Sequence, residues 1–413
     1  MLTRRIFLRG SAIAMAGMGA VPSWLARAAS VEGKKRKTLV VIFQRGAADG
    51  LNIVVPFAEK RYRELRPTLA IGPPVGQAGG IINGPINGNA IDLDGKFALN
   101  GAMQPLKALW DKQQLAIIEA TGSPDSSRSH FDAQDYMESG TSDKTMGDGW
   151  LNRALPPPGA ETSPLRAVAM GNQVARTLRG EREAIAVGDS QQFNMGNQDA
   201  ASILENMYAT SADAQWGRTG KDAFEAMKLI QSINRNPAAP QGGVQYGQGG
   251  DLGRSLQQLA RLIKADAGVE AAFAEIGGWD HHGNENPLLS NVLRQFSSAI
   301  AAFSQDMGDR MEDVVLVTMS EFGRTVEENG NAGTDHGHGS LMMVLGGPVQ
   351  GGKVYGKWPG LEKEQLFEGR DLAVTTDFRS VLSELIRGHL GQTDLGAVFP
   401  GYQPEDPLGL LRS

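Results

Sequence analysis

Residues 38–43 read TLVVIF, and after one glutamine the chain continues as RGAADG through residues 45–50. A continuous apolar run rich in β-branched residues is typical of a buried strand, and a glycine-containing segment is typical of the turn that follows it. Working outward, similar apolar runs recur at 115–118, 167–170, 184–187, 269–276, 313–318 and 341–345. Segments with helical character lie between them, around 106–110, 131–139, 200–233, 252–265, 287–308 and 377–390. This alternation predicts an α/β fold with a mostly parallel central sheet and helices on both faces.

Two stretches depart from the alternation. Residues 68–101 are rich in glycine and proline, which predicts irregular structure. Residues 236–250 read NPAAPQGGVQYGQGG, a low-complexity composition that predicts a flexible surface loop. No internal repeat is visible, and we predict one α/β domain over residues 29–413.

The composition argues against several classes of protein function and of metal site. The 413 residues are 41% hydrophobic and 21% charged, as in ordinary globular proteins. The formal net charge of −6 argues against nucleic-acid binding. The chain contains no cysteine, which excludes disulfides, cysteine-ligated iron–sulfur clusters and thiol nucleophiles. Any metal ion would therefore be held by histidine, aspartate and glutamate.

The first residues carry the pattern of an export signal. Arg4 and Arg5 stand side by side, residues 10–21 form a short apolar stretch, and Ala28 ends a small-x-small cleavage pattern. The paired arginines favour the twin-arginine translocation machinery over an ordinary secretion signal or an uncleaved anchor. We predict cleavage after Ala28 and a periplasmic or extracellular mature protein. No later stretch is apolar enough over about 20 residues to span a membrane.

Polar side chains gather beside the predicted strands. Ligands in open α/β sheets bind at the carboxyl ends of the strands, so these side chains are candidates for a site. Five of the six histidines lie in these connecting segments, which scattered surface histidines would not do. The five histidines are His130, His281, His282, His336 and His338.

The spacing of these residues suggests metal binding. In Asp280-x-His282 and His336-x-His338, two side chains can reach one ion. Together with carboxylates at other strand ends, they supply ligands for two divalent cations, such as zinc, magnesium, manganese or calcium. Two ions would clamp the attacking and leaving oxygens of an in-line displacement. The predicted metal ligands are Asp49, Asp280, His282, Glu321, His336 and His338.

Each of these residues also has a purely structural explanation. Asp49 is a common turn residue, and Glu321 can form an ion pair with Arg324. Asp280 and His282 can cap the helix that follows them. The glycine-rich segment around the last two candidate histidines can be a surface turn.

A serine-rich loop, residues 121–130, follows the strand at 115–118. Ser129 stands just before a predicted helix, where the helix dipole and free N–H groups favour an anionic substrate. It is a candidate nucleophile activated by a metal, and equally a candidate N-cap of that helix. Arg128 and Arg324 are candidates for bidentate binding of the oxygens of an anion.

Five motifs lie in these connecting segments: RGAADGLN at 45–52, RSHFD at 128–132, GWDHH at 278–282, SEFGRT at 320–325 and GTDHGHG at 333–339. Together they resemble the signature of a large bacterial family of twin-arginine-exported proteins classified as a domain of unknown function. The resemblance covers essentially the whole predicted mature chain. That family is in turn distantly similar to the alkaline phosphatase and sulfatase superfamily.

The superfamily resemblance implies an alkaline-phosphatase-like fold and specific roles. Asp49 and Glu321 would take the ligand places of one ion. Asp280 and His282 would hold the other, completed by one histidine of the motif at 333–339, either His336 or His338. The nucleophile position would fall to Ser129 or, less favourably, Ser127.

Two departures from the superfamily pattern stand out. Where those enzymes usually carry Asp-His, this chain has Glu321-Phe322, so one histidine ligand is missing and His338 or His281 is left to replace it. The sulfatase cysteine that becomes formylglycine is also missing, which argues against that chemistry.

The leading hypothesis is an exported metal-dependent hydrolase of phosphate or related esters, acting on a small anionic ester substrate. An alternative is a non-catalytic metal- or ligand-binding envelope protein with the same fold. A third hypothesis is a mononuclear histidine/carboxylate redox centre, with iron as its metal.

Overall fold

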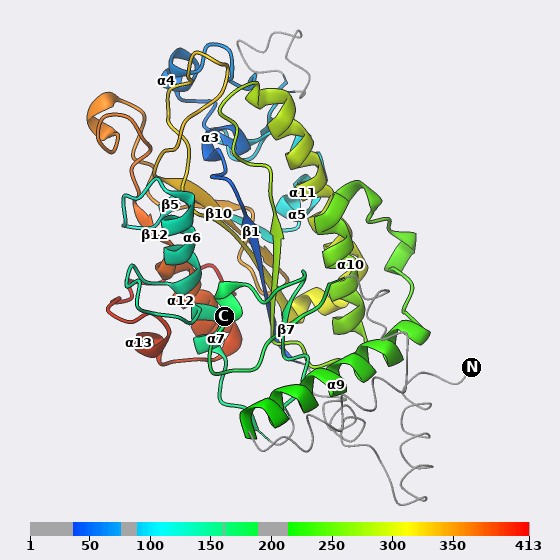
Figure 1. Ribbon diagram of the computed structural model, residues 1–413. Coiled ribbons are helices and arrows are strands. Elements are labelled where there is room, and N and C mark those ends of the chain that lie inside the picture. The colour runs from blue at the N-terminus through cyan, green and yellow to red at the C-terminus, as the bar shows by residue number, and fades with distance from the viewer. Residues whose placement is uncertain (1–35, 76–88, 160–161, 189–213, 413) are drawn as a thin grey trace, which may run out of the picture.

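The computed structural model describes residues 36–75, 89–159, 162–188 and 214–412 (Figure 1). The predicted export signal, with Arg4, Arg5 and Ala28, lies outside the described residues. Within the described ranges, no helix combines the length and the hydropathy that a membrane span requires.

A nine-stranded sheet forms the centre of the molecule, in the order β11-β5-β10-β9-β1-β8-β6-β7 with β12 paired to β5. Pairing is parallel throughout except at β10, which runs antiparallel to both β5 and β9. The strands are β1 (Thr38–Gln44), β5 (Leu115–Gly122), β6 (Ala167–Ala169), β7 (Ile185–Ala186), β8 (Ala271–Ile276), β9 (Val314–Ser320), β10 (Ser340–Gly346), β11 (Lys353–Tyr355) and β12 (Thr376–Asp377).

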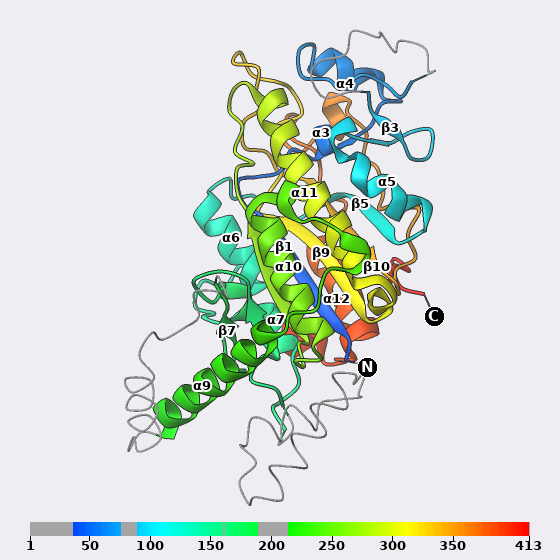
Figure 2. The same cartoon turned by 90° about the vertical axis from the view of Figure 1, so that its right-hand side faces the viewer.

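Side chains of the sheet alternate between two hydrophobic cores. In β1, Val40 and Ile42 enter one core, whereas Leu39, Val41 and Phe43 enter the other. Successive side chains of a strand point to opposite faces, so a fully apolar strand requires cover on both. The first core is closed by α5 (Gln104–Asp111), α9 (Ala214–Arg235), α10 (Gly250–Lys264) and α11 (Glu285–Met307) (Figure 2). The second is closed by α6 (His130–Ser139), α7 (Trp150–Ala154), α12 (Phe378–Leu385) and α13 (Leu395–Val398) (Figure 1).

The predicted α/β class, with a mostly parallel sheet covered on both faces, is confirmed. The region 68–101 differs from its prediction, because part of it joins a small antiparallel sheet of order β2-β4-β3. Residues 76–88 of this region and residues 200–213 of a predicted helix lie outside the described residues. The smaller elements here are α3 (Gly50–Ile53), β2 (Val54–Val55), α4 (Lys60–Leu65), β3 (Ile91–Asp92) and β4 (Ala98–Leu99).

The segment 236–250, expected to be a flexible loop, contains two short 3₁₀ turns, Gln241–Gly243 and Gly247–Gly249. Tyr246 within it is buried, and its hydroxyl donates to Asp306 of α11 over 2.9 Å. The backbone N–H of Gln241 donates to the same carboxylate over 2.7 Å. The segment is therefore anchored to the helical layer.

The direction of β10 brings the candidate residues to one edge of the sheet. Strands β1, β5, β8 and β9 end at this edge, and the antiparallel β10 begins there. The connection from β9 to β10 folds back on itself, so that Arg324 pairs with His336 in an antiparallel bridge. The segments that follow β1, β5, β8 and β9 therefore lie beside the segment that precedes β10.

Candidate metal centre

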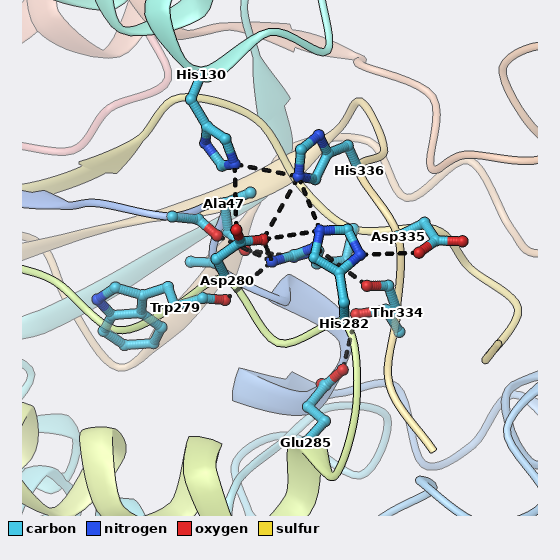
Figure 3. Close-up of polar contacts among 12 residues, drawn as sticks. Ala47, His130, Trp279, Asp280, His282, Glu285, Thr334, Asp335 and His336 are labelled. Atoms are coloured by element: carbon cyan, nitrogen blue, oxygen red, sulfur yellow. Dashed lines mark hydrogen bonds and ion pairs between the residues drawn. The ribbon is translucent and has the colours of Figure 1, made fainter. Parts of the chain in front are cut away.

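Three side chains meet at this edge with the geometry of a metal site. Ligand atoms of His130, Asp280 and His336 all lie within 4.8 Å of one another, and this is the one such group among the described residues (Figure 3). His282 adjoins them, with its Nε2 3.0 Å from Asp280 Oδ1 and 3.1 Å from His336 Nε2. Three imidazoles and one carboxylate therefore form what we call the His₃Asp cluster.

The four side chains come from separate connections. His130 is the first residue of α6, after the serine-rich loop that leaves β5. Asp280 and His282 follow β8, and His336 lies in the connection before β10. His130 and His336 are 206 residues apart in the chain, yet their Nε2 atoms are 3.1 Å apart. The cluster therefore exists only in the folded sheet.

Each imidazole of the cluster is oriented by an acceptor at its Nδ1. His130 Nδ1 lies 2.8 Å from Glu321 Oε1, and His282 Nδ1 lies 2.9 Å from Asp335 Oδ1. His336 Nδ1 lies 2.9 Å from the carbonyl oxygen of Arg128, which can only accept. A proton on each Nδ1 leaves the lone pair of each neutral ring on Nε2, as in metal-ligating histidines held by a second layer of acceptors.

These lone pairs face one another at close range. His336 Nε2 is 3.1 Å from the Nε2 atoms of both His130 and His282, and 3.4 Å from Asp280 Oδ1. Tetrahedral ligands with metal–nitrogen bonds of about 2.0–2.1 Å stand about 3.3 Å apart, close to the separations of His336 from its neighbours. Two imidazole nitrogens at 3.1 Å need either a proton on one of them or a cation beside them. His130, Asp280 and His336 are therefore candidate ligands for a divalent ion.

The pKa directions differ among the residues of the cluster. Burial, with the charges of His130 and Arg324, lowers the pKa of His336. The hydrogen bond to Glu321 raises the pKa of His130. Burial opposes ionisation of Asp280, but the hydrogen bond and charge of Arg324 lower its pKa overall. These directions favour the neutral form of His336 and the charged forms of His130 and Asp280.

Arg324, a predicted anion-binding residue, is fully buried and engaged inside the protein. It donates to Asp280 Oδ1 and to carbonyl oxygens of the connections after β1 and β8 and before β10. Its carbonyl acceptors are Ala47 at 2.9 Å, Gly46 at 3.1 Å, Thr334 at 3.1 Å and Trp279 at 3.3 Å. Arg324 therefore ties the loops of the site together and is not open to a substrate.

Asp49 lies apart from the cluster. Both of its oxygens bind the buried Arg66, Oδ2 to Nη1 at 2.5 Å and Oδ1 to Nη2 at 2.9 Å. Glu285, also buried, lies beside this pair and accepts from Thr334 Oγ1 at 2.7 Å. Burial and the charge of Asp49 raise the pKa of Glu285 well above its usual range.

Glu321 and His338 also stand outside the cluster. Glu321 is buried behind His130, and its Oε1 accepts from Gly46 N at 2.8 Å and Gln134 Nε2 at 3.1 Å. The structure thus places Glu321 as the acceptor that orients the ring of His130. His338 is buried and stacks on Phe367, with ring centroids 4.2 Å apart. His281 is buried too, and burial lowers its pKa to about 4.

The serine-rich loop leads to Ser129, an exposed residue that directly precedes His130. Ser129 is the N-cap residue of α6, yet its side chain makes no cap hydrogen bond to that helix. Ser127 is engaged locally, since its hydroxyl accepts from Ser129 N at 3.2 Å. Arg128 forms ion pairs with Asp371 at 2.6 Å and with Glu368 at 2.7 Å.

Two residues of the site are not among the predicted ligands. His130 is one of the loop histidines, and its place at the start of a helix after a strand is a usable signal. Asp335 adjoins His336 in the chain, and its contact with His282 follows only from the folded connection. Local spacing does not indicate the contact of His130 with Glu321 or that of His282 with Asp335.

No curated protein matches the chain in sequence. The family described as a protein of unknown function, DUF1501, matches residues 36–399, which include every residue of the His₃Asp cluster. The chain belongs to this family.

Proposed function

We propose that the His₃Asp cluster binds one divalent metal ion through His130, Asp280, His282 and His336. The observation that carries this proposal is the meeting of His130, Asp280 and His336, whose ligand atoms lie within 4.8 Å of one another, with His282 beside them and an acceptor at each Nδ1. A divalent ion held there would act as a Lewis acid on a substrate oxygen. Nitrogen and oxygen donors without sulfur suit zinc, manganese or iron.

We further propose that the protein is an exported hydrolase of phosphate or related esters. The exposed Ser129 supports this, because its hydroxyl is not used as a helix cap and it adjoins His130. In the proposed reaction Ser129 Oγ bonds to phosphorus as the bond to the alcohol breaks, and the serine proton leaves with the alcohol. Water then bonds to phosphorus, the bond to Oγ breaks, and the serine regains a proton.

Metal analysis tests the first step of the proposal. Protein purified without chelator should contain about one divalent ion per chain, and His130→Ala and His336→Ala should each contain much less. The matched control is His338→Ala, which removes a histidine of the same motif outside the cluster and should retain the ion. An equal ion content in wild type and both cluster variants would contradict the proposed site.

Hydrolysis of p-nitrophenyl phosphate esters tests the second step, which is catalysis. Ser129→Ala should lower kcat by about 10²-fold or more while the metal content stays unchanged, because the nucleophile is lost. Ser127→Ala serves as the matched control and should keep kcat within about threefold. Full activity in Ser129→Ala would exclude Ser129 as the nucleophile.

The second candidate function is a redox centre. The described residues offer one group of possible metal ligands, whereas a site for two ions requires two such groups. Three histidines and one carboxylate around a single ion also suit iron or manganese that changes oxidation state. Electron paramagnetic resonance of the protein as isolated separates the candidates. A signal that disappears on reduction with dithionite favours redox chemistry, whereas a silent zinc centre favours hydrolysis.

The proposal also includes export of the protein and a relation of its fold to that of alkaline phosphatase. The twin-arginine pattern at Arg4 and Arg5 supports a periplasmic or extracellular location. A processed chain that begins at Ala29 in the periplasmic fraction is the expected result of N-terminal sequencing. The mixed sheet, with its candidate site at the carboxyl ends of parallel strands, supports a relation to the alkaline phosphatase fold.

A further inference from the structure

A cavity of about 470 Å³ lies where β6 and β7 end beside α10. Met170 and Gly171 directly follow β6, and Val187 and Gly188 directly follow β7. The volume falls within the range of about 300–1,000 Å³ that is usual for small-molecule sites. Ligands in open α/β sheets bind at the carboxyl ends of strands, which is where this cavity lies. Of the described residues that line it, none belongs to the His₃Asp cluster.

One side of α10 supplies polar side chains to the cavity. Ser255, Gln258 and Arg261 follow one another at intervals of three residues, so they lie along the same side of the helix, and all three line the cavity. The strand ends contribute Met170 and Val187, which are apolar and buried. An apolar lining with a few polar groups is typical of sites that bind small organic molecules.

The cavity contains one positive charge without a partner. Asp251 and Arg254, which also line it, form an ion pair with each other, so their charges cancel. In the last turn of α10, Lys264 pairs with Asp306. Arg261, in the same turn, forms no ion pair with any residue in the described part of the chain. Its guanidinium has a planar fork of N–H donors that matches a carboxylate, so the cavity favours a ligand with one negative charge.

Gln258 offers a donor that the fold does not use. Its Nε2 is shielded from solvent and has no hydrogen-bond partner within the described residues. A buried donor without an acceptor destabilises a folded protein. Because rotation about the last side-chain bond of glutamine is only weakly restricted, the amide can turn toward a group bound in the cavity. A hydroxyl or carboxylate oxygen of a ligand would then accept from it.

We propose that this cavity binds a small organic molecule with one carboxylate and several hydroxyl groups, such as a sugar acid. The carboxylate pairs with Arg261, and hydroxyl groups bond to Ser255 and Gln258. The carbon skeleton packs against Met170 and Val187. A phosphate monoester fits less well, because near neutral pH it carries close to two negative charges. This site requires neither the proposed metal ion nor the proposed hydrolase activity.

Isothermal titration calorimetry of the full-length protein tests the ligand class. Glucuronate and glucose share a ring and hydroxyl groups and differ in the carboxylate. The Kd of glucuronate should be lower by about tenfold or more, as expected for a hydrogen-bonded charge pair. Glucose 6-phosphate should bind more weakly than glucuronate. Absence of glucuronate binding, or equal binding of glucose, would overturn the proposal, and tighter binding of the phosphate ester would overturn the argument from charge.

An arginine variant locates the carboxylate. Arg261→Gln should remove the preference for glucuronate over glucose, because the neutral amide cannot form the charge pair. The matched control is Arg294→Gln, which removes an exposed arginine of the neighbouring α11 that does not line the cavity. This control should keep the preference. A preference retained in Arg261→Gln would place the carboxylate elsewhere and overturn the proposed site.

Gln258→Leu separates a binding role from a structural one. The Kd of glucuronate should rise severalfold, because a donor to the ligand is lost. Without ligand, the free energy of unfolding should stay equal or increase, since an unpaired buried amide is removed. An unchanged Kd would overturn the contact with Gln258, and a loss of stability without ligand would assign the amide to the fold.

Chelation distinguishes this cavity from the candidate metal centre. Protein treated with EDTA, and verified as folded by circular dichroism, should bind glucuronate with an unchanged Kd. Loss of binding after chelation would place glucuronate at the metal centre and overturn a separate site. Because the measurement is binding without turnover, failure of the hydrolase proposal leaves its result intact.

Discussion

At the scale of single residues, the Asp49–Arg66 pair shows a strand-end carboxylate that supports the fold. The guanidinium meets both carboxylate oxygens and also donates to the carbonyl oxygens of Val326 at 2.9 Å and Thr325 at 2.8 Å. Burial opposes ionisation, but the charge of Arg66 lowers the pKa of Asp49 below its ordinary value. This pair therefore fastens the connection after β1 to the one after β9.

Removal of the Asp49 carboxylate should leave the buried charge of Arg66 without its partner. We expect Asp49→Ala to lower the free energy of unfolding by about 3–5 kcal/mol, measured by urea titration. Glu64→Ala is the control, because it breaks an exposed pair with Lys60 and should change stability by less than about 1 kcal/mol. A variant of Asp49 that keeps its stability and loses the metal ion would instead support the ligand role that the superfamily resemblance implies.

The sequence could predict which residues are polar at strand ends, but not which of them pair. Arg66 lies beside a region that reads as irregular, and nothing in the spacing from Asp49 indicates a contact. Likewise, Glu321 and His130 are 191 residues apart in the chain. Long-range pairing is set by the order and direction of the strands, which local patterns do not contain.

At the scale of secondary-structure elements, β5 carries a carboxyl group inside the protein. Glu119 is buried, and its Oε1 has no hydrogen-bond partner within the described part of the chain. The next residue, Ala120, has a left-handed φ of 53°. Burial, together with the nearby charge of Asp94, raises the pKa of Glu119 well above its ordinary value. The strand therefore holds a neutral acid.

This raised pKa predicts a pH dependence of stability. Glu119 binds its proton more tightly in the folded chain, so its favourable contribution is full below the unfolded pKa of about 4.3. That contribution is lost progressively as pH rises from there toward the folded pKa. Glu119→Gln should therefore flatten the decline of unfolding free energy from pH 4.5 to 8, measured by urea titration. The exposed Glu312→Gln should leave the slope unchanged, and an unaltered slope in Glu119→Gln would contradict the neutral acid.

The sequence predicts which segments form strands better than it predicts where a strand ends or in which direction it runs. The apolar runs predicted the principal strands, because a strand buried on both faces needs apolar residues at every position. The predicted strand at 115–118 continues to Gly122, since pairing with β10 and β12 extends it through a glutamate and a threonine. The antiparallel direction of β10 depends on how the connection from β9 folds back, which the apolar pattern does not record.

At the scale of the whole molecule, the His₃Asp cluster joins connections from distant parts of the chain. An ion bound there stabilises the folded state only, since the unfolded chain does not bring these ligands together. At a free concentration about 100-fold above its Kd, the ion should add about 2.7 kcal/mol to stability. Thermal unfolding with and without EDTA should therefore differ in Tm, and His336→Ala should remove the difference. A Tm difference retained in His336→Ala would place the ion elsewhere.

The position of β10 in the sheet has a consequence for synthesis of the chain. The partners of β5 within the sheet are β10, β11 and β12, all of which follow residue 339. While the ribosome makes residues 123–339, both edges of β5 have no partner, and such edges attract other chains. The centre of the sheet therefore closes around β5 only after residue 339 has been made, and a chain that ends before that residue should be more sensitive to proteases than the full-length protein.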